Sequence, residues 1–250
     1  MRLKKSRAIA SKTVALLVVL GAAYLGMAHQ VMAQDAKKTY STMAPVDQYL
    51  MPDRDAEIAL ARSAAPASIS RDAEVLVLGR HGFATAVKGK NGFVCVVERS
   101  WTSAADADFW NPKVRTPICW NAAAARSIFV RNIKRTQLIL AGRTQAQVDD
   151  AIVAAVDKKE LPAVESGAMC YMMSKQGIGP DGAGTVDQGP SHLMFYFPQA
   201  DPAIWGANLP GSPVLGLTDT REHVTTFVVA VQHWSDGTEY REASAADHHH

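Results

Sequence analysis

The chain has 250 residues, 48% of them hydrophobic and 20% charged, as is ordinary for a globular protein with one sizeable core. Its formal net charge is +2, but five of its 26 Lys and Arg lie in the first 33 residues, which hold none of its 24 Asp and Glu. The remaining chain therefore carries 21 basic against 24 acidic residues, and nucleic-acid binding loses its only compositional support.

Residues 1–33 have the parts of a secretory signal peptide. A basic start is followed by an uncharged run from Thr13 to Ala28, and Val31-Met32-Ala33 fits the −3 and −1 positions of a cleavage site. The alternative is a retained membrane anchor, but the run is shorter than the roughly 20 residues that a spanning helix needs. We expect cleavage near Ala33 and a periplasmic or secreted protein.

No linker divides the rest of the chain. We expect a lead-in segment over 34–70, a single domain over 71–238 and a disordered tail over 239–250. The tail ends in three histidines, either native or left from an expression tag, which we exclude from any site: His248, His249 and His250.

In the lead-in segment, Asp53 is expected to cap a short helix over about Ala56 to Ala64, which Pro66 ends. The densest apolar stretch of the domain, Ala73–Trp101, follows it. Its three apolar runs are separated by turn residues, including Asn91-Gly92, a strong hairpin signal. The pattern predicts an antiparallel three-strand meander, with strands at Val75–Leu78, Phe83–Val87 and Phe93–Val97.

Ser100–Trp120 reads as an irregular loop, because aromatic residues alternate with Pro112 and Pro117. Such a loop either lines a pocket or caps one end of a core. A second Gly- and Pro-rich segment carries Trp205. The residues expected to contact a ligand are Trp101, Trp110, Trp120 and Trp205.

Two helices are expected next. Asn121 is a plausible N-cap for a helix reaching Gly142, and Thr144 to Gln147 forms a capping box for a helix to about Lys159. The first helix carries basic residues that either hold an anionic ligand or form a solvated face: Arg126, Arg131, Lys134 and Arg135.

Further strands are expected at Ala168–Ser174, His192–Phe197, Val214–Leu217 and Thr225–Val231, with a glycine-rich surface loop over 175–190. In the second of these strands, one face holds His192, Met194 and Tyr196. Strands before and after a helical pair predict an α+β fold, with an antiparallel sheet built on the three-strand meander and packed by the helical pair.

Three cysteines allow at most one intramolecular bridge. We favour a disulfide between Cys95 and Cys119, since both adjoin ordered apolar segments, and this pairing leaves Cys170 as a free thiol. The alternative is three buried thiols that act as small hydrophobic residues. There is no C-x-x-C spacing, which disfavours a zinc ribbon or a thioredoxin-type site.

Arg80-His81-Gly82 resembles the R-H-G signature of the histidine phosphatase superfamily, in which the histidine is phosphorylated and the arginine binds the phosphoryl group. In that family a helix follows the motif, whereas here the hairpin residues of FATAV and NGFVCVV follow. A hairpin turn is therefore the favoured interpretation.

The sequence also holds residues suited to two other chemistries. Cys170 with His192 could form a nucleophile–base pair. A metal site would need the fold to gather residues that no ligand spacing links, namely His81, His192, His223, His233 and Glu222. We predict no metal site, and the cofactor is unknown.

Several segments together resemble a group of exported bacterial proteins that have no assigned activity: GRHGF, NGFVCVVERSW, NPKVRTPICWNAAAARS, YMMSKQG, SHLMFYFP and WGANLPGSPV. The resemblance spans roughly residues 70 to 237 and implies a single exported domain.

No complete catalytic set can be assembled from spacing. The favoured function is a non-catalytic small-ligand-binding or accessory protein of the cell envelope, with an unknown small molecule or envelope protein as partner. Membrane contact is expected only through the signal segment. The alternative is an exported hydrolase that uses His81 or His192, with Arg80, Cys170 or a metal ion.

Overall fold

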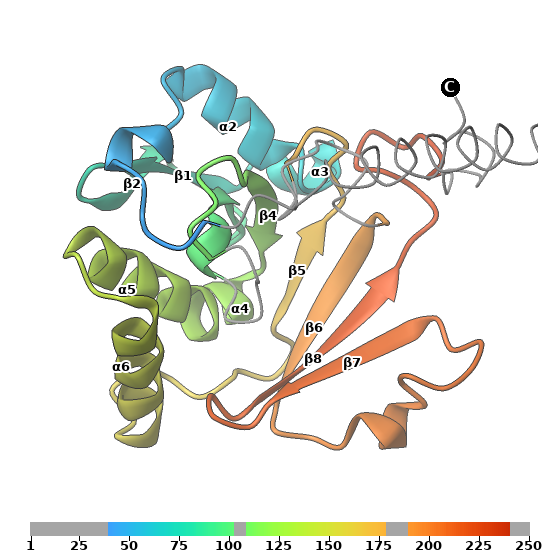
Figure 1. Ribbon diagram of the computed structural model, residues 1–250. Coiled ribbons are helices and arrows are strands. Elements are labelled where there is room, and N and C mark those ends of the chain that lie inside the picture. The colour runs from blue at the N-terminus through green and yellow to red at the C-terminus, as the bar shows by residue number, and fades with distance from the viewer. Residues whose placement is uncertain (1–39, 103–108, 179–189, 241–250) are drawn as a thin grey trace, which may run out of the picture. The chain divides into compact units, whose positions relative to one another are not determined.

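In a computed structural model, which describes residues 40–102, 109–178 and 190–240, the strands form one eight-stranded sheet in the order β2-β1-β3-β4-β5-β6-β8-β7 (Figure 1). All neighbouring strands run antiparallel except β1 and β3. The strands are β1 (Glu74–Gly79), β2 (Gly82–Val87), β3 (Val94–Glu98), β4 (Thr116–Trp120), β5 (Met169–Met172), β6 (His192–Pro198), β7 (Val214–Asp219) and β8 (Val224–Ala230).

Short helices surround the sheet, and the chain therefore has the predicted α+β character with a mostly antiparallel sheet. The α-helices are α2 (Arg54–Arg62), α3 (Ala67–Ser70), α4 (Ala122–Ser127), α5 (Phe129–Leu140) and α6 (Gln145–Asp157). The 3-10 helices are η1 (Val46–Gln48), η2 (Ser100–Thr102) and η4 (Pro202–Trp205). All described residues belong to one compact unit, Thr39–His250.

The predicted three-strand meander is wrong in its third strand. β1 and β2 form the expected hairpin, but β3 pairs with the other edge of β1 and runs parallel to it, with Val75 beside Cys95. The connection crosses the start of β1 so closely that a Cβ on Gly89 would lie 2.3 Å from the backbone nitrogen of Glu74. Asn91-Gly92 does form a turn, with Gly92 at φ +79°, but that turn leads the chain across β1.

β4 was not predicted, because Pro112 and Pro117 made the stretch before Trp120 look irregular. It is a central strand that pairs with β3 over its whole length and with β5 at Cys119 and Trp120. Pro117 lies near the start of β4, before the part paired with β5, so its missing N–H group breaks no bond of that ladder.

The helical pair is more divided than the sequence pattern indicated. Asn121 caps α4 as expected, but the chain breaks at Ile128 and continues as α5. The capping box of Thr144 and Gln147 opens α6 as expected. α4 packs on β4 and β5, whereas α6 packs on α5, so the expected helical pair does not cover the sheet as one layer.

The lead-in helix is part of the core. Asp53 caps α2, accepting hydrogen bonds from the backbone N–H groups of Asp55 and Ala56. α2 then packs on β1, β3 and β4 through Leu60 and Ala61, which are buried. The described part of the predicted segment 34–70 therefore does not form a separate region.

The two faces of the sheet carry different chemistry, since side chains alternate along each strand. On one side, which we call the α2 face, Cys95 and Cys119 lie opposite each other on β3 and β4 under α2. They form a disulfide, the pair favoured from sequence, and Cys170 is a buried free thiol. The other side, which we call the cavity face, includes Ile118 and Met194 and looks towards α5.

Breaking the disulfide should destabilise the fold without abolishing it. The bridge closes a loop with a sequence separation of 24, so its loss should lower the free energy of unfolding by about 2–4 kcal/mol. Urea denaturation with and without reductant measures this for the wild type and for Cys95→Ala/Cys119→Ala. Reductant should shift the midpoint of the wild type only, and an equal shift in the double variant would contradict the assignment.

Candidate functional site

A cavity of about 820 Å³ lies between α5 and the cavity face of the sheet. This volume lies within the range of roughly 300–1,000 Å³ that is usual for small-molecule sites. Strands β3, β4, β5, β6, β8 and β7 all contribute to its lining, together with the loop between β7 and β8. It is therefore built from segments more than 100 residues apart in the chain.

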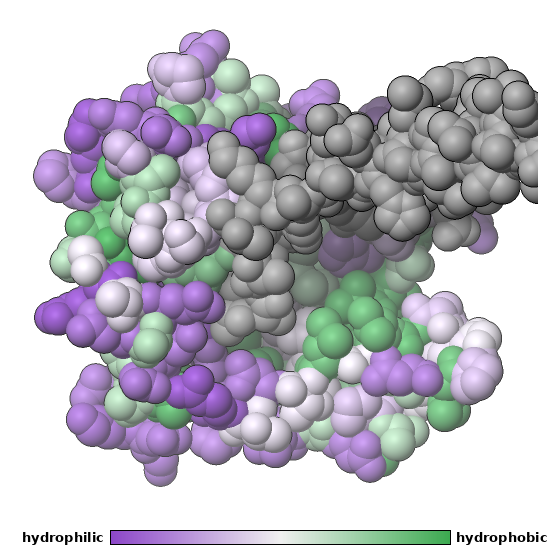
Figure 2. Space-filling model, in the orientation of Figure 1, coloured by the Kyte–Doolittle hydropathy of each residue, from purple (hydrophilic) through white to green (hydrophobic). Residues whose placement is uncertain are grey.

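The floor of the cavity is mainly apolar and aromatic. Figure 2 shows hydrophobic surface where Figure 1 places β6, β8 and β7. On β7, at the edge of the sheet, Leu217 lines the cavity and is still 52% exposed. An exposed apolar surface of this kind, set in a concavity, is typical of a site for an apolar ligand. The side chains of the floor include Ile118, Trp120, Met172, Met194, Tyr196 and Val228.

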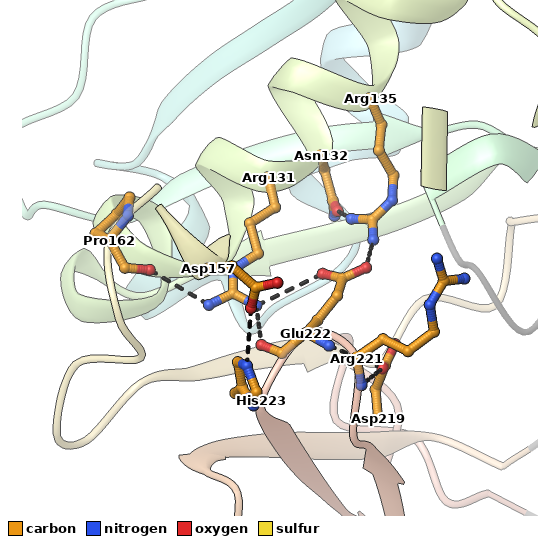
Figure 3. Close-up of polar contacts among 9 residues, drawn as sticks. All are labelled: Arg131, Asn132, Arg135, Asp157, Pro162, Asp219, Arg221, Glu222 and His223. Carbon is orange, nitrogen blue, oxygen red and sulfur yellow. Dashed lines mark hydrogen bonds and ion pairs between the residues drawn. The ribbon is translucent and has the colours of Figure 1, made fainter. Parts of the chain in front are cut away.

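The opposite wall is polar and is organised by one carboxylate. Glu222, in the β7–β8 loop, pairs with Arg131 and Arg135, which lie one turn apart on α5 (Figure 3). Arg131 Nη1 also donates to the Glu222 backbone oxygen at 2.8 Å. Arg135 Nη1 donates to Asn132 Oδ1 at 3.2 Å, and Asn132 Nδ2 donates to Glu98 Oε1 at 2.8 Å. The polar wall is thus one connected, buried network.

Burial controls the ionisation of this wall. Desolvation raises the pKa of Glu98, although hydrogen bonds from Asn132 and Thr102 oppose the shift. Desolvation lowers the pKa of Arg131 and Arg135, but an arginine still keeps its charge at neutral pH. The Nε atoms of both arginines are buried with no hydrogen-bond partner among the described residues. Glu222 is the carboxylate that pairs directly with both arginines, while Asp219 also favours the charged form of each.

The β7–β8 loop is also held by contacts at the surface. Arg221 pairs with Asp150 of α6 at 2.9 Å, and His223 Nε2 lies 3.1 Å from Asp157 Oδ1, also of α6. Asp219 Oδ1 accepts hydrogen bonds from the backbone N–H groups of Arg221 and Glu222, which shapes the turn (Figure 3). These contacts hold the loop against α5 and α6, and the loop forms one end of the cavity.

Arg80 and His81 lie in the exposed turn between β1 and β2, away from the cavity lining. Arg80 forms an exposed ion pair with Asp47. No helix follows the motif, because Gly82 starts β2 directly. The geometry is that of a hairpin turn and does not support a phosphatase site.

Cys170 and His192 share the cavity face of neighbouring strands, but they do not form a nucleophile–base pair. Met194 lies opposite Cys170, and Met172 lies opposite His192. The Cys170 thiol lies 3.4 Å from the Tyr196 hydroxyl, and burial raises the thiol pKa well above its usual value. An activated cysteine needs the opposite shift.

The other histidines are scattered. His223 contacts Asp157 at the surface, and His233 lies in an isolated bridge with Glu239. Across residues 40–102, 109–178 and 190–240, no three His, Cys, Asp or Glu side chains are grouped so that they could hold a metal ion. The sequence-derived hydrolase residues are therefore not brought together.

Of the four tryptophans expected at a ligand, only Trp120 lines the main cavity. Trp101 is fully buried and donates its indole N–H to Thr136. Trp110 borders a second hollow of about 600 Å³ beside the start of α6. Trp205 is 52% exposed and contacts Phe227.

The sequence did not predict that Arg131 and Arg135 are buried. The basic residues of this helix were expected to form a solvated face or to hold an anionic ligand. Arg126 is exposed and pairs with Glu165, as a solvated residue would. The available signal was spacing, since Arg131 and Arg135 are four residues apart and share the helix face of the buried Ile128.

Some expected features lie outside the described residues: the signal segment 1–33, most of the glycine-rich loop (179–189) and most of the C-terminal tail (241–250). Where the chain is described, none of its helices combines the length and hydrophobicity needed to span a bilayer. Comparison with protein-family models, curated proteins and solved structures found no match.

Removing the charge of Glu222 should weaken the fold strongly. Glu222→Gln removes the carboxylate that pairs directly with two buried guanidinium groups and should lower the free energy of unfolding by about 3–5 kcal/mol. Asp150→Asn is the matched control, because it breaks an exposed ion pair of the same loop and should shift the urea midpoint far less. Similar shifts in the two variants would show that Glu222 has no special role.

Proposed function

We propose that the chain is an exported cell-envelope protein that binds a small, largely apolar molecule in this cavity and catalyses no reaction on it. The cavity is the observation that carries this proposal. It has an apolar floor on the sheet, a polar wall on α5 and a volume suited to a small molecule.

The chemistry of the lining supports binding over catalysis. The one cysteine that shares the face of the floor, Cys170, has a buried thiol whose pKa is raised, and its neighbour Tyr196 also has a raised pKa through burial. Neither is poised to attack a substrate or to accept a proton at neutral pH. The charged side chains of the wall, Arg131, Arg135 and Glu222, are engaged with one another.

Two further observations support export. The first 33 residues have the pattern of a cleavable signal peptide. The Cys95–Cys119 disulfide fits the same compartment, because such bonds persist in oxidising surroundings.

The wild type should bind the neutral apolar fluorophore N-phenyl-1-naphthylamine saturably, with one site per chain. Val228→Trp fills the cavity floor and should weaken binding at least about tenfold, or roughly 1.4 kcal/mol. Val229→Trp is the control, since the same side chain then points to the α2 face of the same strand. Circular dichroism checks the fold of both variants. Equal weakening in both, or no saturable binding by the wild type, would refute the proposal.

Export is tested separately by the mass of the secreted form. A chain expressed with its own N-terminus in a Gram-negative host should appear in the periplasmic extract, beginning at Gln34. Full-length chain retained in the membrane fraction would instead favour the anchor interpretation.

A further inference from the structure

Three soft donor side chains meet on the floor of the cavity. Met172 of β5, His192 of β6 and Met194 of β6 all line it, and all three are half-buried rather than enclosed. We propose that they form a copper(I) site, with the thioether sulfurs of Met172 and Met194 and Nε2 of His192 as ligands.

The strand register places these side chains within reach of one ion. Met172 lies directly opposite His192, so their Cβ atoms are about 4.5–5.5 Å apart. Met194 follows His192 by two residues on the same face, a rise of about 7 Å along the strand. The Met194 sulfur accepts a hydrogen bond from the Tyr196 hydroxyl at 3.6 Å, so it must leave this contact to reach the imidazole. A methionine side chain has three rotatable bonds before its terminal methyl group, which allows both sulfurs to turn towards His192.

His192 is held in the tautomer that a metal ligand needs. Its Nδ1 atom lies 2.7 Å from the backbone oxygen of Pro190. A carbonyl oxygen only accepts, so Nδ1 carries the hydrogen and Nε2 keeps its lone pair. Nε2 has no hydrogen-bond partner within the described parts of the chain. A backbone carbonyl on the second ring nitrogen is the usual way to orient a metal-bound histidine.

The donor set determines which metal fits. Two thioethers and one neutral imidazole carry no negative charge, and soft thioether ligands select copper(I) over hard cations such as Mg²⁺ and Ca²⁺. Cys170 lies opposite Met194 on the same face, but its thiol is fully buried and does not line the cavity, so we do not count it as a ligand. Unlike thiols, thioethers also cannot be lost to disulfide formation in an oxidising compartment.

This site goes beyond the small-molecule function and stands independently of it. It uses three side chains at the β5–β6 part of the floor, whereas the apolar ligand is proposed to depend on the whole face. Copper(I) competition and fluorophore binding are separate measurements, and Val228→Trp removes no proposed copper ligand, so the two proposals can fail separately.

The test is anaerobic competition for copper(I) with bathocuproine disulfonate, using the full mature chain. The wild type should take one copper(I) from the chelator. Met172→Leu, Met194→Leu and His192→Gln should each weaken binding at least about tenfold, since loss of even an outer-shell partner costs about 10–100-fold. Leucine nearly conserves the volume of methionine, so the fold should survive.

Met173→Leu is the matched control. Met173 is the next residue along the chain but is buried beside Ala64 at the end of α2, and it does not line the cavity. All variants keep His248, His249 and His250, so any copper bound by these histidines contributes equally to every measurement. A chain ending at Asp247 lacks them, and its difference from the wild type gives the copper that they bind. X-ray absorption should show both sulfur and nitrogen neighbours. Affinities of the Met172→Leu and Met194→Leu variants equal to that of Met173→Leu would overturn the proposal.

Discussion

Glu222 is the counter-charge for two buried arginines, and this interaction joins the far edge of the sheet to the helices. The β7–β8 hairpin is the last described strand pair of the chain and lies at the end of the strand order. Its turn is attached to α5 through Arg131 and Arg135. Since the hairpin and α5 form opposite sides of the cavity, the geometry of the cavity depends on this contact.

A buried ion cluster is a costly way to join two elements. Well-packed apolar side chains would often stabilise a protein as much or more, because charges lose their hydration on burial. Here the cluster performs a task that apolar packing would not. It keeps a loop fixed against a helix while the apolar sheet face beside it stays uncovered.

Because side chains alternate along the strands, the residues that stabilise the fold and the residues proposed to bind ligands lie on opposite faces of the sheet. The α2 face holds the disulfide and packs under α2, where Cys95 and Cys119 are fully buried. The cavity face of the same strands is left for aromatic, thioether and imidazole side chains, several of them only half-buried.

The features that the sequence determined by itself are local ones. The caps of Asp53, Asn121 and Thr144, the β1–β2 hairpin and strands β5, β6, β7 and β8 follow from spacing and turn chemistry within short segments. The shared face of His192, Met194 and Tyr196 also follows, because side chains alternate along any strand.

Tertiary structure decided everything that depends on which segments become neighbours. The parallel pairing of β3 with β1 arises from a connection that crosses β1, and no local pattern encodes which edge a strand joins. Likewise, Arg131 and Arg135 are buried where Glu222, about 90 residues later, is brought against them. Met172 meets His192 through the register of β5 and β6 alone. The periodic pattern of apolar residues reports on only a few neighbouring residues. Strand order, strand register and the pairing of buried charges depend on long-range packing, and these three features build the candidate site.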